Sequence, residues 1–406
     1  MKMLILLTST FPYDTGEDFL NAEVQYISGF DQVLICPCNL KPDAKITKKV
    51  PKEVKVIPLK REPLGSLVYL KLLTHSYVIN EIGGLLRSGK LSSGRFHEML
   101  FFMKHAQELY HQLAQLPDIK SADEVTIYSY WFFDAAAAAA LLAGELKKHG
   151  KKVLQISRAH GFDIHSERAK FSYLPMRDFL LSHVDKLYPC SQNGADTIAR
   201  QFPKYAEKIS PAYLGTVDYG TVKGKREPEF HLVSCAYMVP VKRLHLIVKA
   251  LSFADFPIRW THLGSGPLEE EIRKQAAGLP ENVRVEFAGQ IDNTAIMNFY
   301  RTHSISAFVN VSSSEGIPVS VMEASSFGIP VIATDVGGTS EAVKDGVNGF
   351  LLDKDFKPCE LLEIIRLVNR MKQEEYEQLC DNARNLWEEK FNAQKNFSRF
   401  YEEISK

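Results

Sequence analysis

Short apolar runs alternate with longer helical patterns along almost the whole chain, and this alternation limits the folds that it can adopt. Asp134 stands at the N-cap position of one such helix. In the first half the expected strands are residues 2–7, 32–37, 124–130 and 152–157, and the expected helices are residues 17–28 and 135–148. Strands separated by helices favour parallel sheets with right-handed crossovers.

A second series of the same kind fills the other half. Its expected strands are residues 231–237, 258–263, 283–288, 305–309 and 331–334, with helices beginning near residues 244, 268, 293 and 318. Because 406 residues exceed what one hydrophobic core usually serves, two doubly wound domains are predicted. The joint is expected at residues 214–228, where Gly215, Gly220, Gly224 and Pro228 interrupt a polar stretch.

The composition excludes some classes of protein. Lys and Arg number 49 and Asp and Glu number 49, so the basic excess of a dedicated nucleic-acid binder is absent. No apolar run approaches the roughly 18 residues of a membrane helix, and residues 2–7 are predicted to form a strand rather than a signal peptide. Six cysteines without C-x-x-C spacing are expected to be buried or half-buried thiols, which favours a reducing cytoplasm.

The segment 312–324 carries the clearest chemistry. An apolar strand leads into a turn of small residues, and Pro318 stands at the expected first position of a helix. The free amides of that first turn form an anion site. Glu315 lies just before the helix and Glu323 eight residues later inside it. A carboxylate beside a phosphate site needs another task, and accepting hydrogen bonds from sugar hydroxyls is one.

Two further motifs follow in order. Residues 328–331 read Gly-Ile-Pro-Val, and residues 337–341 read Gly-Gly-Thr-Ser-Glu. With the Glu315 and Glu323 spacing, the chain resembles the large retaining glycosyltransferase family (family 4, or group 1) that has an E-x7-E motif. The resemblance is dense from about residue 234 to 352 and looser in the N-terminal half. It implies the α/β GT-B fold, in which two Rossmann-like, doubly wound parallel-sheet domains face a central cleft.

The resemblance assigns a division of the chain and a set of donor residues. It implies an acceptor-binding domain at residues 1–218, to which a C-terminal helix at about 391–406 returns, and a nucleotide-sugar domain at 219–390. Glu315 then contacts the donor sugar, Glu323 holds the ribose, and the diphosphate lies on the amides of residues 317–321. The implied donor-binding residues are Gly16, Lys242, Arg243, Gly264, Gly266, Gly289, Glu315, Gly316, Ile317, Pro318, Val319, Ser320 and Glu323.

Cations near the leaving group come from Lys242 and Arg243. By resemblance Lys242 is the phosphate lysine and a catalytic residue, together with Glu315. The family usually has an arginine five or six residues earlier, where this chain has Ala236-Tyr237-Met238. Either Arg243 or a residue of the other domain then supplies the second cation, or the leaving group is held less tightly.

The N-terminal half offers His160 and Asp163, directly after the expected strand 152–157, and the carboxyl end of a parallel strand faces the ligand crevice. By resemblance His160 is catalytic and reaches the donor sugar across the cleft, while Asp163 either orients it or meets the acceptor. The loop after the first strand has the single glycine Gly16. Its acidic residues Asp14 and Glu17 would repel a diphosphate, so an acceptor role is as plausible.

No metal or other cofactor is expected. The Asp-x-Asp sequence at 353–355 follows the last core strand and is predicted to be a solvated turn. The resemblance implies retaining transfer of a hexose from a nucleoside diphosphate sugar, with UDP favoured, to a glycan or glycolipid acceptor in bacterial surface polysaccharide synthesis. Alternatives are a GT-B sugar-nucleotide epimerase and a non-catalytic partner subunit. An NAD dehydrogenase is disfavoured because Gly264-Ser265-Gly266-Pro267 lacks the third glycine of the dinucleotide fingerprint.

Residues 60–104 combine seven basic and three acidic residues with interleaved aliphatic and aromatic ones. Two interpretations remain open, namely helices that simply cover the first sheet and a surface that rests on anionic lipid. The sequence therefore predicts a cytoplasmic protein that docks peripherally on the inner face of the plasma membrane through this stretch.

Overall fold

The computed structural model describes residues 1–14, 16–60, 63–222 and 227–406. Its chain divides into two compact units, an N-terminal unit of residues 1–213 and 397–406 and a C-terminal unit of residues 214–396. The first unit ends at Tyr213, before the expected boundary at 218, and the chain returns to it at Phe397, after the expected 391. Gly224, part of the expected joint, lies outside the described residues.

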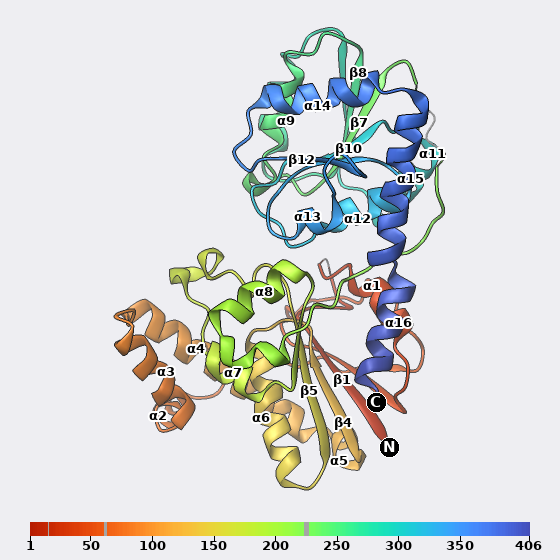
Figure 1. The fold of residues 1–406 in the computed structure, drawn as a ribbon. Coiled ribbons are helices and arrows are strands. Elements are labelled where there is room, and N and C mark those ends of the chain that lie inside the picture. Colours follow the sequence, from red (N-terminus) through yellow and green to blue (C-terminus); the bar gives the residue numbers. More distant parts are fainter. Residues whose placement is uncertain (15, 61–62, 223–226) are drawn as a thin grey trace. The chain divides into compact units, whose positions relative to one another are not determined.

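The described strands form two parallel six-stranded sheets (Figure 1). The N-terminal sheet has the order β3-β2-β1-β4-β5-β6, and the C-terminal sheet has β12-β11-β10-β7-β8-β9. The strands of the N-terminal sheet are β1 (Lys2–Thr8), β2 (Gln32–Pro37), β3 (Val54–Val56), β4 (Glu124–Ser129), β5 (Lys152–Ala159) and β6 (Lys186–Pro189). The others are β7 (Phe230–Cys235), β8 (Ile258–Leu263), β9 (Val283–Phe287), β10 (Ala307–Asn310), β11 (Val331–Thr334) and β12 (Gly349–Leu352). Each order is the doubly wound pattern in which the first strand is central, so the predicted pair of Rossmann-like domains is confirmed.

Helices cover both faces of the N-terminal sheet, and α6 and α16 lie on opposite sides of β1, β4 and β5 (Figure 1). The six alanines 135–140 of α6 are all buried, as expected for a closely packed helix. The helices of this unit are α1 (Leu20–Glu23), α2 (Leu67–Leu72), α3 (Ser76–Arg87), α4 (Ser93–Gln115), α5 (Pro117–Ser121), α6 (Asp134–Lys148), α7 (Arg177–His183) and α8 (Gln192–Gln201). Short 3₁₀ turns lie at Val24–Tyr26, Ser166–Arg168, Lys170–Ser172 and Pro203–Lys208.

The C-terminal unit has its own apolar core, in which α9 and α14 pack together and α12 packs on α15. Trp260 and Ile258 of β8 are fully buried within it. Its helices are α9 (Leu244–Leu251), α10 (Glu269–Ala276), α11 (Asn293–Thr302), α12 (Val319–Ser326), α13 (Thr339–Ala342), α14 (Pro358–Arg370) and α15 (Gln373–Lys390), with a 3₁₀ turn at Pro240–Lys242. The last helix, α16 (Ala393–Ile404), carries the chain back into the N-terminal unit.

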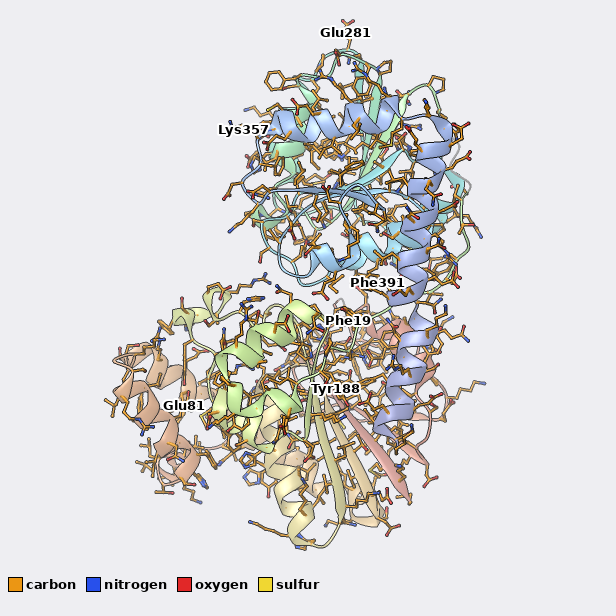
Figure 2. All side chains as sticks on the ribbon, viewed as in Figure 1. Phe19, Glu81, Tyr188, Glu281, Lys357 and Phe391 are labelled. Atoms are coloured by element: carbon orange, nitrogen blue, oxygen red, sulfur yellow. The ribbon has the colours of Figure 1, made fainter. Side chains whose placement is uncertain are left out.

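Helix α16 packs on the N-terminal sheet around a buried ion pair. The Arg158 guanidinium lies 3.5 Å from Glu23, and both side chains are fully buried. Phe400 of α16 lies 4.4 Å below that guanidinium and contacts the rings of Tyr128 and Tyr188, the second of which is labelled in Figure 2. The helix therefore closes a polar cluster that water would otherwise reach.

The first and last segments of the C-terminal unit, near residues 215 and 392, are joined by backbone hydrogen bonds. Thr216 exchanges backbone hydrogen bonds with Phe391 and Ala393, at 2.9 and 3.1 Å. A Cβ atom on Gly215 would lie 2.4 Å from the Cα of Ala393, so only glycine fits there. This explains one of the glycines in the expected joint by packing rather than by flexibility.

Several predicted boundaries differ from the structure. The helix expected at residues 17–28 is reduced to α1 and one 3₁₀ turn, because Glu17 has a left-handed φ of 51° and Ile27 is extended. Asp134 is the first residue of α6 rather than its N-cap, which is Phe133. Pro318 is the N-cap of α12 rather than its first residue, because its ψ of 123° is not helical. Strand β7 ends at Cys235 instead of 237.

Among the described residues, no helix is long and apolar enough to cross a membrane. Four of the six cysteines are buried and Cys235 is half-buried, as expected, but Cys359 is exposed. Burial raises the pKa of Cys36 to about 12, which makes its thiolate scarce at neutral pH.

We expect Phe400→Ala to lower the free energy of unfolding of the N-terminal unit by about 3–5 kcal/mol, because it opens a cavity beside a buried charge. Phe253→Ala is the matched control, since that ring is 67% exposed, and should cost under about 0.5 kcal/mol. Urea unfolding followed by fluorescence measures both. Equal losses in the two variants would contradict the packing described for α16.

Candidate active site

The carboxyl end of β10 positions the first glutamate of the sequence motif. Asn310, the last residue of this strand, accepts a hydrogen bond from the Ser312 amide at 3.0 Å through its side-chain oxygen. Its side-chain nitrogen donates to Glu315 Oε1 at 3.4 Å. Lys242 Nζ lies 2.6 Å from the same oxygen, and both side chains are largely shielded. The structure thus brings Lys242 and Glu315 together, although 73 residues separate them.

Lys242 is held in place by its loop. The Ser313 amide donates to the Val241 carbonyl at 2.8 Å, which joins the two loops that follow β7 and β10. Arg243, next in the chain, has a left-handed φ of 50° and is the N-cap of α9. Its guanidinium donates to the carbonyls of Val311 and Lys354 at 2.7 Å and of Ser312 at 3.2 Å. The predicted second phosphate cation therefore already has three acceptors and serves to brace the loops.

The Gly-Gly turn presses directly on the glutamate's backbone. Gly337 has a φ of 60°, and a Cβ there would lie 2.0 Å from the Glu315 carbonyl oxygen. The Gly338 amide donates to the Gly316 carbonyl at 2.7 Å. This contact fixes the backbone at Glu315 and Gly316, from which the chain enters α12.

Helix α12 carries the second glutamate. Ile317 and Pro318, which lead into it, are buried, and its first two residues, Val319 and Ser320, are half-buried. Glu323 is only 8% exposed and accepts a hydrogen bond from the Asn293 side chain at 2.6 Å. A carboxylate so enclosed needs polar partners, and hydroxyl donors of a ligand can share it with Asn293.

The two predicted glycines after β8 are explained by backbone packing, and Gly289 after β9 has a left-handed φ of 69°. Cβ atoms on Gly264 and Gly266 would lie 2.2 Å from the Ala236 carbonyl oxygen and 2.6 Å from the Met238 nitrogen. The Gly264 amide also donates to the Gly289 carbonyl at 3.0 Å. The loops after β7, β8 and β9 are thereby joined. Tyr237 lies in the segment where the family that the chain resembles usually has an arginine. Its side chain points outward and is 59% exposed.

In the N-terminal unit Glu17 folds back onto the loop that follows β1. Its carboxylate accepts hydrogen bonds from three backbone amides, those of residues 9, 10 and 11, at 2.7–2.9 Å. The Trp131 indole donates to it at 2.7 Å. The side chain is 7% exposed. Glu17 thus occupies amides that an external anion would otherwise use, and it organises the loop itself.

The remaining residues of this loop are tied to the segment 45–48. Asp14 accepts from the Lys45 amide at 3.1 Å, and its carbonyl accepts from the Lys48 ammonium at 2.8 Å. The Gly16 carbonyl accepts from the same ammonium at 2.7 Å. Thr15 lies outside the described residues. The acidic residues of the loop are therefore partnered within the protein.

His160 lies at the carboxyl end of β5, packed against Phe19 (Figure 2), Tyr130 and Trp131. Its Nε2 donates to the Tyr130 carbonyl at 3.2 Å, because a carbonyl can only accept. Burial, and secondly the charge of Arg158, lower the pKa of His160 to about 3. The imidazole is therefore neutral at physiological pH, with Nδ1 free of a proton.

Asp163 orients the loop that contains His160. Its two carboxylate oxygens accept from the backbone amides of His160, at 2.5 Å, and of Phe132, at 2.7 Å. Burial raises the pKa of this carboxyl, while nearby Arg177 and the amide hydrogen bonds act in the opposite direction. Of the two roles predicted for Asp163, the contacts describe a positioning residue.

A cavity of about 620 Å³ adjoins Gly16 and Glu17 at the same edge of the sheet. Trp131, Phe133 and Phe162 line it, and the His105 ring forms a short hydrogen bond with Asp134 at its wall. Sequence reasoning missed these residues. The available signal was the run Trp131-Phe132-Phe133, which follows a buried strand directly at its carboxyl end.

Among the described residues there is no group of three or more His, Cys, Asp or Glu side chains arranged to hold a metal ion. Asp353 and Asp355 lie in the turn after β12, where the Asp355 amide donates to the Asp353 carboxylate. The expectation of a metal-independent site stays a prediction.

The fold is that of GT-B glycosyltransferases. The lipopolysaccharide outer core galactosyltransferase WaaB superposes with a TM-score of 0.69 at 15% identity, covering 100% of this chain and 99% of that one. HepE of Anabaena in complex with UDP gives a TM-score of 0.66 at 18% identity, with 100% of both chains covered. At these identities the likeness concerns the fold.

Similarity in sequence points the same way. Residues 221–386 match the family described as Glycosyl transferases group 1. A putative colanic acid biosynthesis glycosyltransferase of Salmonella typhimurium is 26% identical over 58% of this chain, and the chain spans 60% of that relative's length. An uncharacterized glycosyltransferase of Methanocaldococcus jannaschii is 26% identical over 69% of the chain and 75% of its own length. These matches show that the chain is similar to glycosyltransferases, and its fold is the GT-B fold that the sequence motifs indicated.

Gly337→Ala should destabilise the C-terminal unit by more than Gly346→Ala. Both glycines have a left-handed φ, 60° and 70°, so both variants bear the same conformational cost of about 1–2 kcal/mol. Only Gly337 faces the Glu315 carbonyl, whereas a Cβ on Gly346 meets nothing within 4 Å. Chemical unfolding of the two variants measures the difference, and equal losses would contradict a rigid contact at Glu315.

Proposed function

We propose that this protein is a retaining glycosyltransferase that moves a hexose from a nucleoside diphosphate sugar to a glycan or glycolipid acceptor in bacterial surface polysaccharide synthesis. The observation that carries the proposal is the Lys242–Glu315 pair, 2.6 Å apart, at the entry to α12. It sets a cation beside the helix N-terminus and a carboxylate beside that cation. Such a pair suits a ligand that is a phosphate at one end and a polyhydroxylated sugar at the other.

In the proposed reaction Lys242 and the backbone N–H groups of residues 317, 319 and 320 bind the diphosphate; Pro318 has no N–H to donate. Glu315 accepts hydrogen bonds from the sugar hydroxyls, and Glu323 accepts them from the ribose. The bond between the anomeric carbon and the phosphate oxygen breaks as the acceptor hydroxyl attacks on the same face. The acceptor's proton passes to the leaving phosphate oxygen, so no protein nucleophile is needed.

We assign acceptor binding to the N-terminal unit, at the cavity beside Gly16 and Glu17. Aromatic walls can pack on the apolar faces of sugar rings, and the His105–Asp134 pair adds polar partners. His160, neutral at physiological pH, is our candidate in this unit for a contact with the donor sugar. As a neutral group it acts through hydrogen bonding rather than as a proton donor in acid–base catalysis.

We favour UDP as the carrier of the sugar, and we propose that no metal takes part. The solved structure of HepE contains UDP, and the Salmonella relative is named for colanic acid biosynthesis. Thermal shifts with UDP-, GDP- and ADP-sugars identify the base.

Lys242→Gln should lower kcat/KM by about 10²–10³-fold, since it removes one donor to the developing charge. Lys249→Gln, on the exposed side of α9, is the control and should retain activity. Proton NMR of the product gives its anomeric configuration, and an inverted linkage would rule out the retaining mechanism.

Two other outcomes identify the alternatives. An isomerised sugar formed from donor alone indicates an epimerase. Unchanged activity of a Glu315→Ala variant within a complex indicates a non-catalytic subunit. In either case the proposed transfer reaction is wrong.

We also propose peripheral binding to anionic membrane through α2 and α3. Leu67 and Leu70 of α2 are 70% and 64% exposed, and Ile79 and Leu86 of α3 are 53% and 59% exposed. Each pair lies on one helix face, because the spacings are three and seven residues. The exposed Lys71 and Arg87 lie on the same helices. Of the stretch at 60–104, Arg61 and Glu62 lie outside the described residues.

Lys71→Glu combined with Arg87→Glu should abolish sedimentation with anionic vesicles at low salt, because each basic residue contributes about 1 kcal/mol near such a surface. Leu67→Gln with Leu70→Gln should weaken binding independently of salt. The pair Lys147→Glu and Lys148→Glu, at the end of α6, is the charge-matched control. Binding that survives the first two double variants would contradict this surface.

A further inference from the structure

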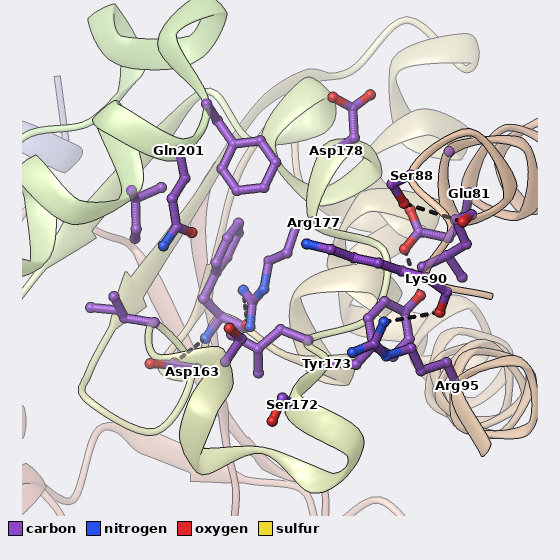
Figure 3. A pocket seen from close by; sticks show the side chains of 18 residues that line it. Glu81, Ser88, Lys90, Arg95, Asp163, Ser172, Tyr173, Arg177, Asp178 and Gln201 are labelled. Carbon is purple, nitrogen blue, oxygen red and sulfur yellow. Dashed lines mark hydrogen bonds between the residues drawn. The ribbon is translucent and has the colours of Figure 1, made fainter. Parts of the chain in front are cut away.

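A second cavity of the N-terminal unit, of about 370 Å³, lies between α3, α7, α8 and the loop that follows β5 (Figure 3). It shares Asp163 with the loop of His160 but contains none of the donor residues assigned above. Its lining includes three basic side chains, Lys90, Arg95 and Arg177, and three acidic ones, Glu81, Asp163 and Asp178. The kind of ligand that the cavity can bind depends on which of these side chains already have hydrogen-bond or ion-pair partners within the protein.

Arg177 is a buried cation with unused donors. Its side chain is 9% exposed, packs 4.7 Å from the Phe132 ring and donates through Nη1 to the Phe132 carbonyl at 2.7 Å. Within the part of the chain that the structure describes, its Nε and Nη2 have no hydrogen-bond partner. Burial lowers the pKa of Arg177 to about 10, against the attraction of Asp163 and Glu81, so the guanidinium stays charged at neutral pH.

The three carboxylates of the cavity make their hydrogen bonds and ion pairs with groups other than Arg177. Asp163 accepts from two backbone amides, as described above. Glu81 accepts from the Tyr173 hydroxyl at 2.5 Å and from the Met176 amide at 3.3 Å. Asp178 pairs with Lys204 at 2.5 Å. Arg177 forms no ion pair within 4.0 Å among the described residues, while the charges of Asp163 and Glu81 act on it from a greater distance.

Lys90 supplies a second cation on the opposite wall. Its amide donates to the Leu85 carbonyl, and its carbonyl accepts from Arg95 Nη1, both at 2.9 Å, so its backbone is fixed. The Arg95 guanidinium also donates to the Phe171 carbonyl, so its donors are already used within the protein. The Lys90 side chain extends across the cavity toward Arg177 (Figure 3). Two cations that converge on one space repel each other unless an anion lies between them.

We propose that this cavity binds an oxyanion, a phosphate or a carboxylate, between Arg177 and Lys90. The planar guanidinium offers two adjacent donors, Nε and Nη2, which match two oxygens of either group. Gln201, on the side of Arg177 away from Lys90 (Figure 3), can donate to a third oxygen. Anion binding itself does not depend on sugar transfer. If the proposed function holds, anion binding in this cavity implies an anionic acceptor, whose phosphorylated or uronic acid unit is held beside the His160 loop.

Isothermal titration of the full-length protein tests the site with inorganic phosphate, glucuronate and glucose. We expect one or both anions to bind and neutral glucose not to bind at the same concentration. Binding of phosphate alone identifies a phosphate site, and binding of glucuronate alone identifies a carboxylate site. If neither anion binds at millimolar concentration, the proposal is wrong.

Variants locate the binding. Lys90→Gln, at an exposed position, should weaken the anion affinity by about tenfold or more, because a charge-assisted hydrogen bond is lost. Arg177→Met should abolish binding and Arg177→Lys should restore part of it, with circular dichroism checking that each variant folds. Lys120→Gln, exposed and outside the cavity, is the charge-matched control. Unchanged affinity in Lys90→Gln would overturn the proposal, and because binding is the readout, loss of sugar transfer alone would not.

Discussion

Backbone-to-backbone contact between the loops at the carboxyl edge of the C-terminal sheet is the constraint on which the candidate site depends. Gly337 meets the Glu315 carbonyl, and Gly264 and Gly266 meet residues 236 and 238. Loops that lie this close leave no room for side chains, so each fixes the path of the next. Glu315 and Lys242 are held at hydrogen-bond distance by this packing, and preorganised charges need no rearrangement when charge develops in a reaction.

Loops of the N-terminal unit are also fixed by internal contacts, but here the contacts are hydrogen bonds from backbone amides to carboxylates. There the buried carboxylates of Glu17 and Asp163 bind amides of their own loops. Each carboxylate accepts hydrogen bonds from amides that would otherwise have no partner, and these hydrogen bonds fix the conformation of the loop. The net charge of the chain is zero, so any local excess of charge comes from where the fold places its charged side chains and which of their donors and acceptors lack a hydrogen-bond partner. Arg177 is such a cation, although nothing in the composition reveals it.

Strong local signals in the sequence predicted the fold well and the site in part. Strands β2, β8 and β11 have the predicted limits, whereas β3, β6 and β12 were not predicted, because three or four residues show no period of their own. Strand β11 is equally short, but the Gly-Ile-Pro-Val sequence at its start marks it. The glycines at 264 and 266 were predicted to bind the donor, and in the structure each lies against protein backbone. Neither the three carbonyls that hold Arg243 nor the amides that hold Glu17 are visible in a linear pattern, because they come from loops that only the folded sheet brings together.

The return of α16 to the N-terminal unit has a consequence for how the chain is made. The ribosome releases residues 1–213 long before residues 397–406, yet Phe400 and Tyr401 cover the buried Arg158 and Glu23. During synthesis the first unit therefore waits with a charged cluster open to water while the second unit, continuous in sequence, can complete its core. Vectorial synthesis thus favours an order of maturation in which the part made first is finished last.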